Sequence, residues 1–154
     1  MYVIKVDVDS KNPILAQKTV SEDMDLLKGE LMASELEITS VTLGDDEYTV
    51  IADSQPFLVN KYNISAFSPS DNVEDSGIYF GSVIICKSID GVLSSLSTED
   101  IDHISKNSIV MRTEDGLMAP CVIFGSPFKN MKHRDQAVRK LNEFIDFFNK
   151  QLSE

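Results

Sequence analysis

The apolar runs of this chain are short, and their length limits what it can fold into more than any other feature. The longest, such as residues 83–86 and 121–124, have the length of β-strands, whereas a membrane-spanning helix needs about 20 consecutive apolar residues. Residues 1–7 lack the basic start and the long apolar stretch of a secretion signal, and they are typical of a first strand. We therefore expect a cytoplasmic protein that has no contact with a membrane.

Composition agrees with a single globular domain. The chain has 42% hydrophobic and 25% charged residues, which are ordinary globular proportions. A domain of 154 residues can bury roughly 70% of its unfolded surface, so neither a metal nor a disulfide is needed to hold it together. No internal repeat, low-complexity tract or linker divides the sequence, and we expect one domain over residues 1–154.

Several segments show the β-branched content or the alternation of strands, and turn residues separate them. The predicted strands cover residues 2–8, 14–20, 36–43, 48–52, 78–86, 109–111 and 118–124. Gly81 interrupts one of these strands and indicates a bulge or a close backbone approach. Residues 53–76 have no regular pattern, and a loop of this length in a small domain is either functional or flexible.

Helices are predicted in three places. Residues 22–33 have a helical apolar period and follow Ser21, a good N-terminal cap. A short helix opens at Ser97, where Asp100 completes a variant of the capping box. The third helix, residues 133–152, is the clearest element in the chain. The fold class that follows is α+β, with a mostly antiparallel sheet of five to seven strands, two or three helices and the amphipathic C-terminal helix packed on the sheet.

The apolar residues of the C-terminal helix recur with helical period and form one stripe. They are Ala137, Leu141, Phe144, Ile145, Phe148 and Leu152. Phe147 falls roughly 60° outside this stripe. We expect its ring to pack at the margin of the core, with a contact to a partner chain as the alternative.

Charge is distributed unevenly along the chain. The net charge is −11, and residues 29–60 hold seven acidic side chains and no Lys or Arg. The seven are Glu30, Glu35, Glu37, Asp45, Asp46, Glu47 and Asp53. Affinity for nucleic acid comes chiefly from Lys and Arg that neutralise phosphates, and the basic run at 129–134 is short. This distribution disfavours direct nucleic-acid binding and favours a basic protein partner.

No set of residues indicates catalysis, and the sequence favours a non-enzymatic protein over an enzyme. A thiol nucleophile needs an exposed thiolate and a neighbouring base, but Cys86 and Cys121 lie in apolar strands while His103 and His133 lie in polar segments. We expect both cysteines to be reduced and buried. The acidic runs around 45–47 and 99–102 lack the ligand spacing of a calcium loop, and no glycine-rich phosphate loop occurs. We therefore predict no cofactor and no metal.

Parts of the chain resemble a known family. The segments are DLLKGELMASELEI at 25–38, YTVIADSQPFLVN at 48–60, and residues 78–104, which contain IYFGSVIICKSIDG and LSTEDIDHI. They are similar to a family of small uncharacterised proteins from bacteriophages, plasmids and conjugative elements of Gram-positive bacteria. The similarity covers at most half of the chain. It implies an accessory gene of a mobile element, and it brings no catalytic residues.

The leading hypothesis is an acidic accessory protein that acts by protein–protein contact, on a basic protein that binds nucleic acid. Its predicted contact residues are Glu35, Glu37, Asp45, Asp46, Glu47, Asp53 and Phe147. A solvated surface that keeps the protein soluble is the simpler interpretation of the same charges. One alternative is a small enzyme or ligand binder with a pocket built by residues 53–76, lined by Tyr62 and Asn63. The other is a self-assembling structural protein that uses the C-terminal helix to form a homo-oligomer.

Overall fold

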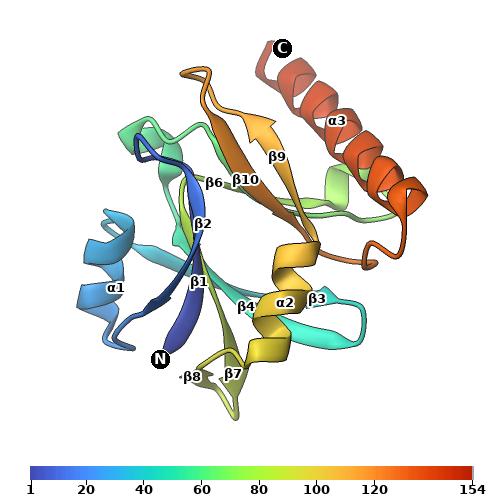
Figure 1. The fold of residues 1–154 in the computed structure, drawn as a ribbon. Helices are drawn as coiled ribbons and strands as arrows, with labels where there is room; N and C mark the ends of the chain where they lie inside the picture. The colour runs from blue at the N-terminus through green and yellow to red at the C-terminus, as the bar shows by residue number, and fades with distance from the viewer. Residues whose placement is uncertain (154) are drawn as a thin grey trace.

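A computed structural model describes residues 1–153 as two stacked β-sheets flanked by helices (Figure 1). The first sheet has the strand order β2-β1-β7-β4-β3, with β8 paired to β7. Its strands are β1 (Tyr2–Asp7), β2 (Ile14–Thr19), β3 (Leu36–Leu43), β4 (Asp46–Asp53), β7 (Val83–Ile89) and β8 (Val92–Ser94).

The second sheet has the order β6-β5-β10-β9. Its strands are β5 (Ile64–Ser68), β6 (Gly77–Phe80), β9 (Ser108–Arg112) and β10 (Met118–Ile123). All named strands pair antiparallel except β5 with β10, which are parallel. The helices are α1 (Met24–Leu31), α2 (Thr98–Lys106) and α3 (Met131–Ser153), with short 3₁₀ helices η1 (Pro56–Val59) and η2 (Val73–Asp75).

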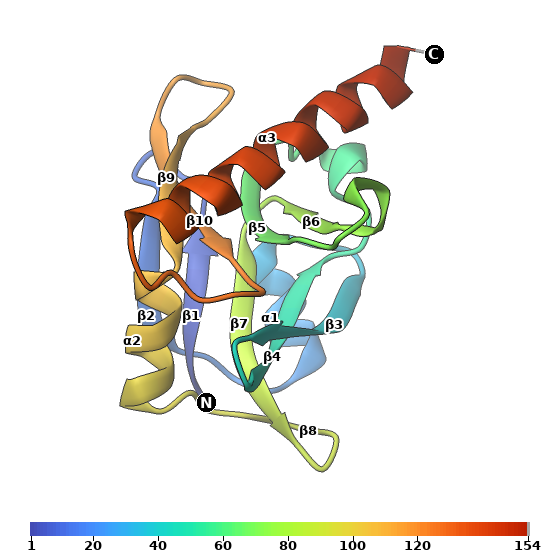
Figure 2. The same cartoon turned by 90° about the vertical axis from the view of Figure 1, so that its right-hand side faces the viewer.

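Alternation along the central strands decides how the layers stack. On β7, Ile85 faces the core between the two sheets, whereas Ile84 lies in the apolar cluster that α1 covers. On β10, Val122 faces the same central core, whereas Cys121 and Ile123 lie in the cluster that α3 covers. Successive strand residues point to opposite faces, so a strand that is buried on both sides must be apolar throughout. The layers therefore run α1, first sheet, second sheet, α3 (Figures 1 and 2).

The predicted α+β class, the mostly antiparallel pairing and the packing of the C-terminal helix on a sheet are confirmed. The strands number ten in two sheets, however, where the sequence predicted five to seven in one. The irregular segment 53–76 contains β5, and the short β8 follows β7. Gly81, at φ +80°, divides the predicted strand 78–86 into β6 and β7. Its predicted close approach is also present, because an added Cβ would lie 2.8 Å from Cδ of Lys61.

The caps explain where the two short helices begin. Ser97 and Asp100 form the predicted capping box at the start of α2. Helix α1 begins later than expected, because the carboxylate of Asp23, not the hydroxyl of Ser21, accepts hydrogen bonds from the N–H groups of Asp25 and Leu26. No helix within residues 1–153 is long and apolar enough to cross a membrane.

One buried ion pair joins three parts of the fold. The ammonium of Lys61 lies 2.9 Å from Oδ2 of Asp53 at the end of β4. It also donates to the carbonyl oxygens of Leu31 at 2.7 Å and Met32 at 3.1 Å, which end helix α1. The three N–H donors of the ammonium thus each have an acceptor. Two of these acceptors are carbonyls at the end of α1 that have no partner within the helix.

We expect Lys61→Met to lower the free energy of unfolding by about 3–5 kcal/mol, because it leaves the Asp53 carboxylate buried without its partner. Lys106→Met is the matched control, since Lys106 pairs with Asp102 at 2.8 Å on the exposed face of α2 and should cost less than about 0.5 kcal/mol. Urea unfolding of both variants measures the difference. Equal losses of stability in the two variants would show that the buried Lys61 pair contributes no more to stability than the exposed Lys106 pair.

An aromatic pocket as the candidate functional site

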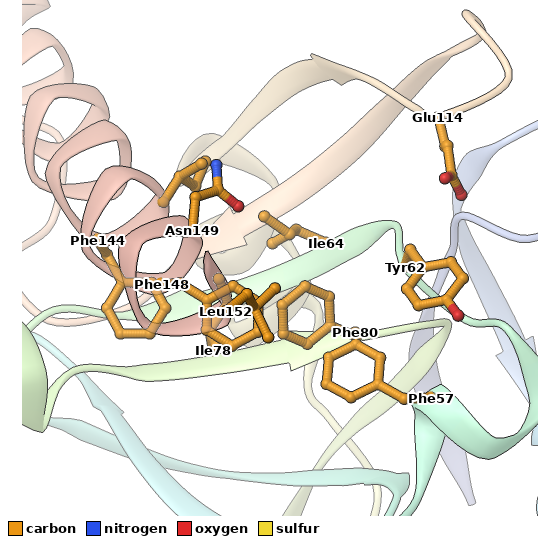
Figure 3. A pocket seen from close by; sticks show the side chains of 11 residues that line it. Phe57, Tyr62, Ile64, Ile78, Phe80, Glu114, Phe144, Phe148, Asn149 and Leu152 are labelled. Carbon is orange, nitrogen blue, oxygen red and sulfur yellow. The ribbon is translucent and has the colours of Figure 1, made fainter. Parts of the chain in front are cut away.

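A pocket of about 510 Å³ opens between the C-terminal half of α3 and the segment that carries η1 and β6 (Figure 3). Most of its wall is apolar and aromatic. The lining residues are Phe57, Tyr62, Ile64, Ile78, Phe80, Glu114, Phe144, Ile145, Phe148, Asn149 and Leu152.

The strand period and the helix period supply two walls of the pocket. On β6, Ile78 and Phe80 are two residues apart and face the pocket, whereas Tyr79 between them packs against the central core. On α3, Phe144, Phe148 and Leu152 repeat every four residues and line the same side. The C-terminal turns of α3 extend past the strands, so this side is only partly covered by the sheet (Figure 2).

The third wall is η1. Pro56 lies in its first turn and Asn60 ends it with a left-handed backbone, which places Phe57 beside α3 and β6. The Phe57 ring lies 4.9 Å from that of Phe80 and stacks on that of Tyr62 at 5.6 Å between centroids. Phe57 and Tyr62 each remain 44% exposed, so a large part of their ring surface is open to a ligand.

Three polar side chains stand among these rings: Tyr62, Glu114 and Asn149. The Tyr62 hydroxyl donates to Oδ1 of Asn60 at 3.1 Å. Within residues 1–153, the Glu114 carboxylate and the Asn149 side-chain amide make no hydrogen bond. Both can therefore bond a molecule in the pocket, which would sit against aromatic faces with a few polar groups at its edge.

The two pocket residues expected from the sequence have different roles. Tyr62 lines the pocket. Asn63 does not; its amide donates to the carbonyl of Val8 at 3.2 Å, and its Oδ1 accepts from the N–H of Glu114 at 2.9 Å. Asn63 thus holds in place the β9–β10 loop that carries Glu114. The sequence pattern assigned the residues of α3 to the core and left Phe57, Phe80 and Glu114 without a role, because nothing local relates segments so far apart in the chain.

The acidic residues of the region 29–60 do not form one patch: Glu30 pairs with Lys5 and Lys18, Asp53 is buried, and the other five form two groups. Glu35 and Glu37 lie at the start of β3, whereas Asp45, Asp46 and Glu47 lie at the turn that joins β3 to β4. The closest members are Glu37 and Glu47: Glu47 pairs across the hairpin with Thr42, five residues from Glu37, which is about 17 Å along an extended strand. This is about twice the screening length of roughly 8 Å at physiological salt, so each group acts on a partner separately.

Two of the predicted contact residues have structural roles. Asp53 is 6% exposed and pairs with Lys61, so the prediction that it contacts a partner at the surface is wrong. Its sequence neighbours gave no sign of this, because both Asp53 and Lys61 lie in the segment 53–76, which has no regular pattern to relate them. Phe147 is half-buried beside Phe144, 6.3 Å between ring centroids, and is not among the residues that line the pocket. This agrees with packing at the margin of the core.

Both cysteines are free and buried, as expected. Burial raises the pKa of Cys86 to about 11 and that of Cys121 to about 12, so both are protonated at neutral pH. They lie on the outer faces of different sheets, Cys86 in the cluster under α1 and Cys121 in the cluster under α3. A disulfide between them is excluded by this arrangement.

On α2, the carboxylate of Asp100 has a structural role. Oδ1 of Asp100 accepts from the Tyr48 hydroxyl at 3.1 Å and lies 3.0 Å from the Lys87 ammonium, and Oδ2 accepts from the N–H of Ser97 at 2.8 Å. Burial raises the pKa of Asp100, but the bonds from Ser97, Lys87 and Tyr48 outweigh it and hold the pKa below its usual value. Within residues 1–153, no group of three or more His, Cys, Asp or Glu side chains is placed to hold a metal ion.

Comparisons of the chain with protein-family models, with curated proteins and with solved structures find no match of any kind.

The buried thiols lead to a measurable expectation. Ellman's reagent at pH 8 should modify neither Cys86 nor Cys121 in the native protein and both after denaturation, because burial keeps the thiols protonated and out of reach. Ser40→Cys, at an exposed position of β3, provides the control and should react rapidly at one thiol. Rapid reaction of the native wild-type protein would contradict the burial of these residues.

Proposed function

We propose that this protein binds a small, mainly apolar and aromatic molecule in the pocket between η1, β6 and α3. One observation carries the proposal: a cavity of about 510 Å³ whose eleven lining residues include five aromatic rings and only three polar side chains. Pockets for small molecules typically measure about 300–1,000 Å³ and combine apolar walls with a few polar groups that fix orientation.

The exposure of the lining residues supports binding over simple core packing. Leu152 is 70% exposed at the end of α3, and Phe57 on η1 is 44% exposed. A buried large apolar side chain gains about 1.5–3 kcal/mol relative to an exposed one. A ligand in the pocket would cover part of this surface and recover part of that free energy.

N-phenyl-1-naphthylamine, a neutral aromatic probe that fluoresces in apolar surroundings, tests the proposal. We expect a saturable fluorescence increase with one probe per chain. Phe148→Ala should weaken binding about tenfold, because it removes one aromatic wall. Phe147→Ala is the matched control, since the Phe147 ring lies on the same helix but does not line the pocket. The affinity of this variant for the probe should stay within about twofold of the wild-type value.

Two outcomes would contradict the proposal. One is the absence of saturable probe binding by a protein whose folding circular dichroism has verified. The other is a stable dimer in light scattering that Phe148→Ala dissociates, because the pocket would then be an interface between copies of the chain, as the self-assembly hypothesis predicts.

The turn between β3 and β4 supports a second candidate function, contact with a basic protein. Asp45, Asp46 and Glu47 are all exposed there, and among the described residues none of them pairs with a Lys or Arg; Nδ1 of His103 lies 3.4 Å from Asp46. An exposed turn with three adjacent carboxylates attracts a cationic surface at low ionic strength. The resemblance to proteins of mobile elements makes a nucleic-acid-binding protein of the host or of the element the natural partner.

Capture from a host lysate distinguishes the two acidic groups. We expect a triple variant Asp45→Asn, Asp46→Asn, Glu47→Gln to lose a partner that the wild type retains at low salt, because its turn no longer carries charge. The double variant Glu35→Gln, Glu37→Gln changes the other end of the hairpin and should retain the partner. Equal capture by the wild type and the triple variant would remove this candidate.

A further inference from the structure

We infer that the ligand of the aromatic pocket is an organic cation: a quaternary or protonated amine attached to an apolar or aromatic body. This inference rests on the proposed function, since it specifies the ligand of the same pocket. Two features carry it, the arrangement of the aromatic rings and the charges around them.

The aromatic side chains form a connected group around the cavity. Phe57 contacts Tyr62, Phe80 and Phe148, with centroid distances of 5.6, 4.9 and 6.2 Å. Phe144 continues the group through Phe148 at 6.3 Å. The face of an aromatic ring is electron-rich and attracts a cation within about 6 Å, and several rings around one cavity are the usual way in which proteins recognise quaternary ammonium groups.

Glu114 is the single charged residue among the eleven that line the pocket. Its carboxylate points from the β9–β10 loop toward the Tyr62 ring (Figure 3). The hydrogen bond from its N–H to Asn63 fixes the backbone at this point. A cation held against the rings would therefore face a carboxylate at the rim, which strengthens its binding and leaves no positive charge in the wall to oppose it.

The surrounding segments are also negative. Between residues 53 and 80 the only Lys or Arg is Lys61, and its ammonium is already paired with Asp53. The same stretch contributes Asp71, Glu74 and Asp75, around η2, which packs against α3. With a net charge of −11 for the whole chain, the field around the protein raises the local concentration of cations and lowers that of anions.

A second cavity on α3 shows that this charge character belongs to the pocket and not to the helix as a whole. It lies along the N-terminal half of α3, has a volume of about 650 Å³, and its lining includes Lys129, His133, Arg139 and Lys140. Four of the five Lys and Arg side chains of α3 lie in that half, Lys132, Arg134, Arg139 and Lys140, and the fifth, Lys150, lies near the C-terminal end. An anionic ligand would find a favourable wall there and an unfavourable one at the aromatic pocket.

Two molecules of the same shape test the inference: phenyltrimethylammonium, which is a cation, and tert-butylbenzene, which is neutral. Titrations followed by ¹H–¹⁵N NMR of the full chain give the affinity of each. We expect the cation to bind about tenfold more tightly, the factor that cation–π and carboxylate contacts of this kind supply.

Glu114→Gln should reduce this preference to about threefold, because it weakens the binding of the cation and leaves the affinity for tert-butylbenzene unchanged. Glu99→Gln, which removes one exposed carboxylate from α2 outside the pocket, is the matched control and should change neither affinity. Because Glu114 lies in an exposed loop, its substitution is not expected to affect folding.

The outcomes separate the inference from the function on which it rests. Equal or tighter binding of tert-butylbenzene, by a protein that still binds N-phenyl-1-naphthylamine, would overturn the cationic ligand and leave the binding function intact. Failure of all three probes would overturn both. A cation preference that Glu114→Gln leaves unchanged would overturn the role of this carboxylate.

Discussion

The buried ammonium of Lys61 fixes the part of the molecule on which the candidate site depends. It joins the end of β4, through Asp53, to the last carbonyls of α1, through Leu31 and Met32. The residue follows η1 directly, so the same contacts anchor the segment that carries Phe57 and Tyr62. Gly81 allows this arrangement, because any side chain there would collide with the lysine stem. A desolvated charge has few geometries in which all its hydrogen bonds are made, and such a pair therefore specifies one position for the chain around it.

The pocket exists because α3 is longer than the sheet face that it covers. Its middle residues, Leu141 and Phe144, are buried against β5 and β10. Beyond them α3 extends past the strands (Figure 2), and its apolar stripe continues to Leu152, which is 70% exposed. The segment with η1 and β6 closes this space only in part, since Phe57 and Tyr62 keep much of their surface exposed. The result is an apolar cavity at the edge of the second sheet, bounded by parts of the chain that are about 90 residues apart.

Acidic residues that are close together in the sequence lie in separate parts of the folded protein. Of the acidic residues in 29–60, Asp53 lies in a buried ion pair and Glu30 pairs with Lys5 and Lys18, while two glutamates lie at one end of a hairpin and three carboxylates at the other. Two cations of α3, Arg139 and Lys140, line the second cavity together with Lys129, while the aromatic pocket has one carboxylate and no cation among its lining residues. Each region therefore has its own electrostatic character, because screening in water limits the reach of a surface charge to about 8 Å at physiological salt.

Local pattern in the sequence was sufficient for the α+β class, the hairpin of β3 and β4, the capping box of α2, the amphipathic helix α3 and the burial of both cysteines. These depend on side-chain period, turn chemistry and caps, which are properties of neighbouring residues. The division of the strands into two sheets, the burial of Asp53 and the pocket itself were decided by tertiary structure. They depend on which faces meet when residues far apart in the chain pack together, such as Lys61 with Asp53 and Leu31, or Phe57 with Phe148. A short-range pattern in the sequence cannot predict such contacts. They form only when the layers pack together, which buries both faces of β7 and of β10.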